Sequence, residues 1–156
     1  MKKVQLVGPF ICAFFLFSSC SRNVGDERSM EGYWRGFYQF KTEVTKGQQS
    51  QNLFGKDPIS IYCKIEQTGD VFIGQYSTKF DADAFKREVP TNSRKVEGVV
   101  SGRSAIIRFH NTTENGFYTP MEAKVLLSNG EVSGEWKMEY EYNGSLYSGV
   151  IKLTRY

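Results

Sequence analysis

The 156-residue chain carries a formal net charge of +3 and contains 15 glycines and 12 phenylalanines. This length suits one domain, and the small charge lacks the concentrated basic face of a nucleic-acid-binding protein. Many glycines and aromatic residues favour β-strands joined by turns. The composition therefore predicts one small β domain that does not bind nucleic acid.

The first nineteen residues have the pattern of an export signal. Lys2 and Lys3 are followed by a mostly apolar run over residues 4–17, and small residues then precede Cys20. This order is typical of cleaved secretion signals, and the run is shorter than the roughly 20 apolar residues of a membrane-spanning helix. We expect residues 1–19 to be removed, which lowers the formal charge to +1 because only Lys2 and Lys3 are lost.

The segment Phe17-Ser18-Ser19-Cys20 resembles a bacterial lipobox, although Phe17 stands where leucine is usual. The resemblance implies that Cys20 is acylated, becomes the new N-terminus and anchors the protein in a membrane of the cell envelope. The outer membrane is the expected location, on its periplasmic or its surface face. Residues 20–31 then form a polar, lipidated tether.

Eight segments of alternating apolar and polar residues follow the tether. This period of two residues, with glycine- and asparagine-containing turns between segments, predicts strands and hairpins. The predicted strands are residues 32–40, 59–67, 71–78, 95–101, 105–111, 121–128, 131–141 and 145–156.

The connections between these strands differ in length. In an up-and-down meander, the long segments 41–58, 79–94 and 112–120 begin at the same end of the sheet, which we name the loop end. Three tight turns meet at the other end, the hairpin end. Within residues 79–94, Asp81 as N-cap and Pro90 as stop predict a helix of one or two turns, with coil as the alternative.

Eight antiparallel strands can close into a barrel, which leaves no exposed sheet edge. Glycines recur at positions expected to face inward, where they let strands coil tightly; they are Gly36, Gly74, Gly134 and Gly149. The sequence predicts an all-β, eight-stranded antiparallel up-and-down barrel over residues 32–156. A two-sheet sandwich is the alternative.

The cysteines predict neither a disulfide nor a metal site. Cys12 leaves with the signal and Cys20 is acylated, so Cys63 is alone in the mature domain. Cys63 lies in an alternating apolar run, where a small buried hydrophobic residue is expected.

Short motifs make the chain similar to the calycin group, which contains the lipocalin-like and avidin-like barrels. The motifs are Gly32-Tyr33-Trp34, Thr68-Gly69-Asp70 with Gly74-Gln75-Tyr76, Ser133-Gly134-Glu135-Trp136, and Leu153-Thr154-Arg155. The resemblance implies that Trp34 packs against Arg155 as a structural plug. The predicted topology also brings both residues to the hairpin end.

Four tyrosines are expected to point into the barrel near the loop end: Tyr38, Tyr76, Tyr140 and Tyr147. Arg108 or His110 joins them, depending on which face of their strand is buried. Aromatic walls with a few polar tips are typical of ligand pockets. Eight-stranded barrels can also be filled by their own side chains, so a filled interior is the alternative.

The sequence thus predicts a non-enzymatic envelope lipoprotein that binds a small apolar or aromatic ligand at the loop end. The single histidine, His110, has no recognisable nucleophile or metal ligand near it in the sequence. We therefore expect no catalytic residue, metal or cofactor. The alternative function is a module with a filled core that binds an envelope protein or glycan through its loops.

Overall fold

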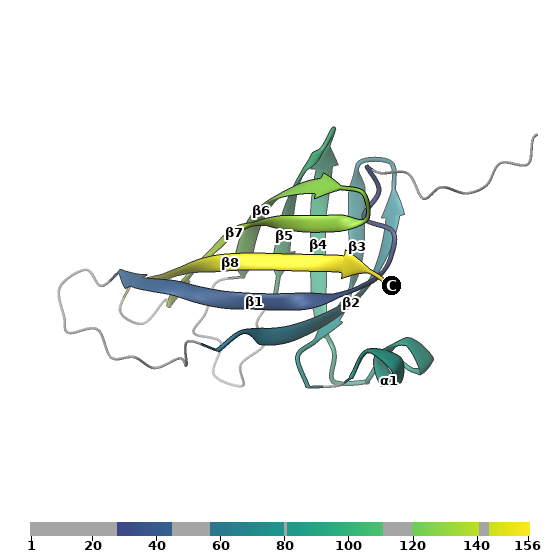
Figure 1. Ribbon diagram of the computed structural model, residues 1–156, viewed down its shortest axis with the longest axis horizontal. Coiled ribbons are helices and arrows are strands. Elements are labelled where there is room, and N and C mark those ends of the chain that lie inside the picture. The colour runs from purple at the N-terminus through teal and green to yellow at the C-terminus, as the bar shows by residue number, and fades with distance from the viewer. Residues whose placement is uncertain (1–27, 45–56, 80, 111–119, 141–143) are drawn as a thin grey trace, which may run out of the picture.

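The computed structural model describes residues 28–44, 57–79, 81–110, 120–140 and 144–156, and at residues 42–44, 140 and 145 it describes the backbone alone. Within these ranges, eight strands form a closed antiparallel barrel in chain order, with β8 paired to β1 (Figure 1). The elements are β1 (Gly32–Val44), β2 (Ile59–Thr68), β3 (Val71–Ser77), α1 (Ala82–Arg87), β4 (Arg94–Ser101), β5 (Ser104–Phe109), β6 (Met121–Ser128), β7 (Glu131–Tyr140) and β8 (Ser145–Arg155). The predicted barrel is confirmed, and the sandwich is wrong.

β1 is the strand that differs most from its prediction. It continues past the predicted end at Phe40 to Val44, because its second half keeps pairing with β8 beyond a bulge between Phe40 and Thr42. A bulge bends a strand and increases its local twist. β1 can therefore pair with β2 through its first half and close the barrel against β8 along most of its length.

The hairpin end contains the turns after β2, β4 and β6. Asn129 and Gly130 both have positive φ angles, 49° and 75°, as a two-residue hairpin turn of type I′ requires. Gly69 and Gly102 also have positive φ. The tight turns predicted from these residues are confirmed.

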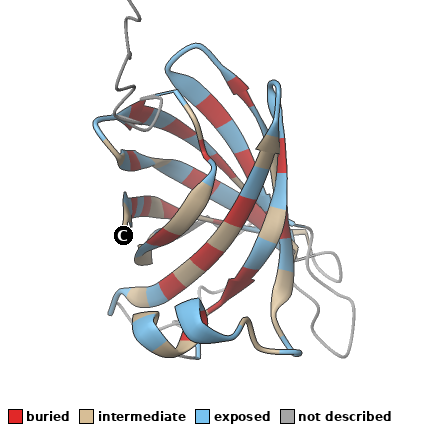
Figure 2. Ribbon diagram, turned by 90° about the vertical axis from the view of Figure 1, so that its right-hand side faces the viewer, coloured by how far each residue is buried: buried red, intermediate tan, exposed pale blue. Residues whose placement is uncertain are grey.

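The barrel interior is occupied by a single cluster of buried apolar residues contributed by all eight strands, from Met30 to Leu153. Buried residues alternate with exposed ones along the strands (Figure 2). At two inward glycines the neighbouring backbone comes very close: a Cβ at Gly36 would lie 1.9 Å from the Lys152 carbonyl oxygen, and one at Gly149 would lie 1.9 Å from that of Gln39. A larger residue at either position would push adjacent strands apart.

The helix α1 covers part of the outer wall of the barrel. Its predicted N-cap is confirmed, since the Asp81 carboxylate accepts a hydrogen bond from the Ala84 N–H at 2.8 Å. Phe85 is fully buried and packs beside Tyr62 of β2, and the Tyr156 hydroxyl donates to the Ala82 carbonyl at 3.0 Å. The connection 79–94 begins at the loop end, but its helix lies beside the C-terminal residues (Figure 1).

A different part of the outer wall, on β3 to β6, carries exposed aliphatic side chains. Val71, Val99 and Ile106 are cross-strand neighbours there, and Ile73 and Leu126 are each more than half exposed. The alternation that predicted the strands therefore does not mean that every outward position is polar. No helix within the described ranges is long and apolar enough to cross a membrane.

Candidate ligand-binding site

The hairpin end holds the plug predicted from the calycin resemblance. Trp34 and Arg155 are paired across β1 and β8, and the Arg155 guanidinium carbon lies 4.8 Å from the centroid of the Trp34 ring. The indole N–H of Trp34 donates to the Met30 carbonyl at 2.7 Å, and Arg155 Nη2 donates to the Ser29 carbonyl. The predicted contact is confirmed, and it closes this end with an apolar, hydrogen-bonded cap.

The same contacts show that the folded domain starts before the predicted boundary at residue 32. Met30 is fully buried, and its backbone N–H donates to Gln67 Oε1 at 2.6 Å. The fold therefore includes Ser29 and Met30, which the sequence had placed in the tether before a boundary at residue 32. Cys20 and the predicted signal lie outside the described residues.

An aromatic wall lines the loop-end half of the interior on β1, β7 and β8. The ring centroids of Phe40 and Trp136 are 4.8 Å apart, those of Tyr38 and Trp136 are 5.8 Å apart, and those of Phe40 and Tyr147 are 6.3 Å apart. Trp136 is held by a 3.1 Å hydrogen bond from its indole N–H to the Val150 carbonyl. Trp136 and Tyr147 are buried, whereas Tyr38 and Phe40 are only partly buried against the core. The wall thus presents two incompletely covered rings over a fixed indole.

Tyr76 and Phe109 pack together on β3 and β5, with ring centroids 5.1 Å apart. The Tyr76 hydroxyl donates to the His110 carbonyl at 3.1 Å. Burial raises the pKa of Tyr76 to about 12, although the Arg94 side chain acts in the opposite direction. Tyr76 is therefore a neutral phenol at physiological pH, oriented by its hydrogen bond to the backbone.

Arg94 is the functional candidate that the sequence reasoning missed. It is the first residue of β4, is paired with Tyr76 and is half-buried. It also acts on Tyr38, whose pKa is raised by burial and lowered in part by the Arg94 charge. The signal was present: the inward residues Val96 and Val100 share their face of the strand with Arg94, which lies two positions before Val96.

A polar groove of about 400 Å³ opens beside this cluster, where β3 ends and β4 begins. It is lined by Tyr76, Ser77, Thr78, Lys79, Thr91, Asn92, Ser93 and Arg94. No carboxylate of the described part of the chain forms an ion pair with Arg94 or Lys79. The groove therefore combines two cations with hydroxyl and amide groups.

The predicted site residues divide into three groups. Tyr38, Tyr76 and Tyr147 face the interior, as expected. The side chain of Tyr140 lies outside what the structure describes. The expectation that Arg108 faces inward is wrong, because the buried face of β5 is that of Ala105, Ile107 and Phe109.

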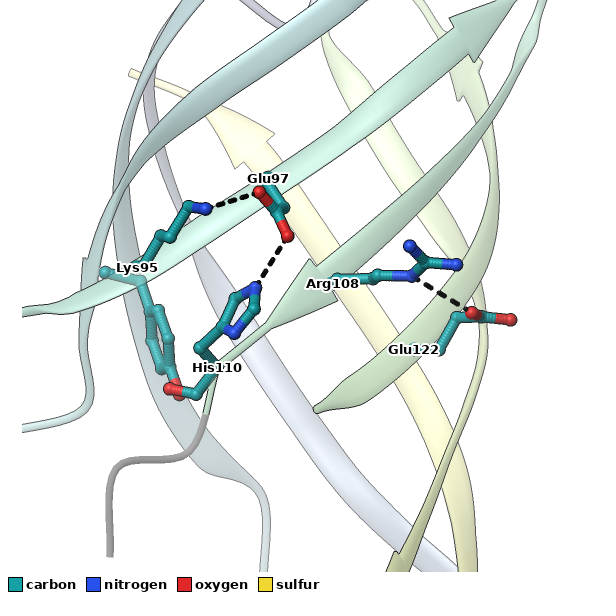
Figure 3. Close-up of polar contacts among 6 residues, drawn as sticks. Lys95, Glu97, Arg108, His110 and Glu122 are labelled. Carbon is teal, nitrogen blue, oxygen red and sulfur yellow. Dashed lines mark hydrogen bonds and ion pairs between the residues drawn. The ribbon is translucent and has the colours of Figure 1, made fainter. Parts of the chain in front are cut away.

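Arg108 forms an ion pair with Glu122, separate from the nearby cluster of Lys95, Glu97 and His110 (Figure 3). Its Nε lies 3.3 Å from Glu122 Oε2. Glu97 binds Lys95 at 2.6 Å and His110 Nε2 at 2.8 Å, and these two contacts lower the pKa of its carboxyl group. His110 is thus engaged on the outside of the barrel, away from the interior rings.

The remaining candidate for reactivity, Cys63, is a core residue. It is a fully buried free thiol, and burial raises its pKa, so it is not a thiolate at physiological pH. In the described ranges, no group of three or more His, Cys, Asp or Glu residues is placed to hold a metal ion.

Comparison with known proteins does not assign the chain to a family. No protein-family model matches it, and no curated protein matches it. The structure therefore shows the fold class, an eight-stranded closed antiparallel barrel, and no family.

Proposed function

We propose that this protein is a non-enzymatic, lipid-anchored envelope protein with a calycin-like barrel that binds a small ligand with an apolar or aromatic body at the loop end. The observation that carries the proposal is the aromatic wall, where Tyr38 and Phe40 are incompletely buried over the fixed indole of Trp136. Partly covered rings with nearby polar groups are the usual surface of a small-molecule site.

The lipid anchor is supported by the lipobox-like segment at Cys20 and by the place where the chain enters the fold. Ser29 and Met30 lie at the hairpin end, against Arg155 and Gln67. The nine residues from Cys20 to Arg28 can span at most roughly 30 Å when fully extended. An acylated Cys20 would keep the hairpin end near the membrane and leave the loop end accessible to ligand.

The anchor can be tested by metabolic labelling with a radioactive fatty acid. The wild-type chain should be labelled and found in the membrane fraction, whereas Cys20→Ser should be unlabelled. An unlabelled wild-type chain would rule out acylation.

A binding role, rather than catalysis, is supported by the state of the titratable groups. The raised pKa values of Tyr38 and Tyr76 leave both phenols protonated at neutral pH, where they serve as hydrogen-bonding groups. His110 is engaged by Glu97 on the outer wall. The alternative function is binding of a protein or glycan through the loops, and of its four expected aromatic anchors Phe85 is instead buried against Tyr62 on the barrel wall.

The two tryptophans allow a site-specific binding test, because Trp34 lies at the hairpin end and Trp136 at the loop end. The chain from Cys20 to Tyr156, with Cys20→Ser, would be titrated with the neutral aromatic probe N-phenyl-1-naphthylamine. With Trp34→Phe, the emission of Trp136 should be quenched as the probe binds.

The matched control is Trp136→Phe, which leaves Trp34 as the reporter. Its emission should change little at the same probe concentration. Equal quenching of both tryptophans would indicate non-specific association, and saturating binding without any effect on Trp136 would place the site elsewhere.

A further inference from the structure

We propose that the ligand is an anion, in which an apolar or aromatic body lies on the aromatic wall and a carboxylate, sulfate or phosphate group pairs with Arg94 and Lys79. This inference rests on the proposed ligand-binding function and adds the chemical class of the ligand.

The first support is the contrast between Arg94 and the cations of the outer wall. Several lysines on the outer wall form ion pairs with carboxylates, namely Lys41 with Glu135, Lys95 with Glu97, and Lys152 with Glu131, and those without a described ion pair, such as Lys124 and Lys137, are exposed to water. Arg94 is half-buried, and its described partner is the neutral hydroxyl of Tyr76. A partly desolvated cation is stabilised by an opposite charge, so an anionic ligand would supply what the described residues around Arg94 do not.

The second support is the orientation of the polar groups. Tyr76 donates to the His110 carbonyl, and the Arg94 side chain, which starts from the residue paired with Tyr76, acts on the same hydroxyl group. Guanidinium groups bind carboxylate, sulfate and phosphate through paired hydrogen bonds. Burial raises the pKa of Tyr38 and the Arg94 charge lowers it in part, so the Tyr38 phenol stays protonated and can donate a further hydrogen bond.

The third support is the composition of the groove. Its lining contains Lys79, Arg94 and side chains with hydroxyl or amide groups, with no aspartate or glutamate. The backbone N–H of Lys79 is held by the Ser77 hydroxyl at 3.2 Å. Such a lining is complementary to negative charge and not to a cation.

Tyr38 belongs to the aromatic wall and interacts electrostatically with a residue of the polar groove. Its ring contacts Trp136 and Phe40, and the positive charge of Arg94, which lines the groove, acts on its hydroxyl group. A ligand with both an apolar body and an anionic group can therefore occupy both surfaces at once. A neutral ligand would use only the aromatic wall.

Two probes that differ by one charged group separate these cases. N-phenyl-1-naphthylamine is neutral, and 8-anilino-1-naphthalenesulfonate has the same aromatic body with a sulfonate. Binding of each to the Cys20→Ser, Trp34→Phe chain would be measured through energy transfer from Trp136. We expect the sulfonate to bind roughly 10- to 100-fold more tightly, as for one charge-assisted contact, and this preference to shrink with added salt.

The decisive variant is Arg94→Gln, which should remove most of the preference for the sulfonate and leave the neutral probe unaffected. The matched control is Lys95→Gln, because Lys95 is the next residue but is exposed on the outer wall and paired with Glu97. Lys79→Gln removes an exposed charge from the groove and should reduce the preference by a smaller factor. A reduced preference for the sulfonate in Lys79→Gln would support the inference even if Arg94→Gln fails to fold.

The outcomes distinguish the two proposals. If both probes bind equally and Arg94→Gln and Lys79→Gln change neither, the ligand-binding function stands and the anion inference is overturned. If neither probe binds near Trp136, both are overturned. With the sulfonate preference established, competition by 2-naphthoate and by 1-naphthyl phosphate would tell which anionic group the groove prefers.

Discussion

The two ends of the barrel use the same kinds of residue for different purposes. Each has one tryptophan and one arginine on inward-facing positions: Trp34 and Arg155 at the hairpin end, Trp136 and Arg94 at the loop end. Arg155 lies over the indole and donates to a backbone carbonyl. The charge of Arg94 instead acts on the Tyr76 hydroxyl, beside a polar groove.

The difference shows how one barrel separates stability from recognition. At the hairpin end Trp34 and Arg155 stack on each other and donate hydrogen bonds to backbone carbonyls, so this end closes the core, although the buried Arg155 Nε has no hydrogen-bond partner among the described residues. At the loop end a half-buried cation and partly covered rings are left beside the groove. A charge or a ring that the chain does not fully cover reduces the stability of the fold. Such groups are kept at positions where a bound ligand covers them.

The largest expected effect is that of Trp34→Ala. It removes a fully buried ring and its contact with Arg155, and it should lower the free energy of unfolding by about 3–5 kcal/mol. Chemical denaturation would measure it, with Phe40→Ala at the loop end as the comparison. Phe40 is partly exposed, so its truncation should cost clearly less. A loss below about 1 kcal/mol for Trp34→Ala would mean that the hairpin end is not sealed by this residue.

The second effect is on alkaline stability. The pKa of Tyr76 is raised from 10.0 to about 12 in the folded protein, so the unfolded chain loses this proton first. The contribution of Tyr76 to stability is therefore complete below pH 10 and is lost as pH rises towards 12, by roughly 2–3 kcal/mol. Denaturation curves of wild type and Tyr76→Phe should diverge in their pH dependence only in this range. Parallel curves would contradict the burial of the phenol.

Arg155→Gln should have a smaller effect. It removes the cation over Trp34, a contact with a typical contribution of roughly 0.5–2 kcal/mol, together with the hydrogen bond to Ser29. We expect destabilisation of about 1–2 kcal/mol. An altered emission spectrum of Trp34, measured with Trp136→Phe, would localise the change to the hairpin end.

The same substitution at the other end gives the smallest expected effect. Arg94→Gln should change the free energy of unfolding by less than about 0.5 kcal/mol, because the desolvation cost of this half-buried cation offsets its favourable interaction with the Tyr76 hydroxyl. A loss as large as that for Arg155→Gln would make Arg94 a structural residue and remove the distinction between the two ends.

The barrel could be predicted from the sequence because the strand periodicity, the turn residues and the expected topology agree. Asn129-Gly130 marks a turn that needs two positive φ angles, and inward glycines mark close strand approaches. The Trp34–Arg155 contact followed from a resemblance and from strand order together. These are local or topological signals, which one sequence contains.

The loop end was less predictable, for identifiable reasons. The prediction for Arg108 depended on which face of a short strand is buried, and a register shift of one residue reverses that choice. Arg94 was missed because the strand was started one residue late, at Lys95. The packing of Phe85 on Tyr62 depends on where a long connection folds back, and no local pattern encodes that.

The pairing of β1 with β8 has a consequence for the order in which the protein forms. Seven of the eight strand pairings join neighbours in the chain and can form as soon as the second strand of each pair is available, but the seam joins the first strand to the last. During synthesis β1 must wait for β8, with one edge unpaired and Trp34 lacking its arginine. Contacts between distant segments form slowly, and unpaired edges invite aggregation. We therefore expect closure of this seam to be the slow step of folding, and the incomplete chain to be the species most in need of a chaperone.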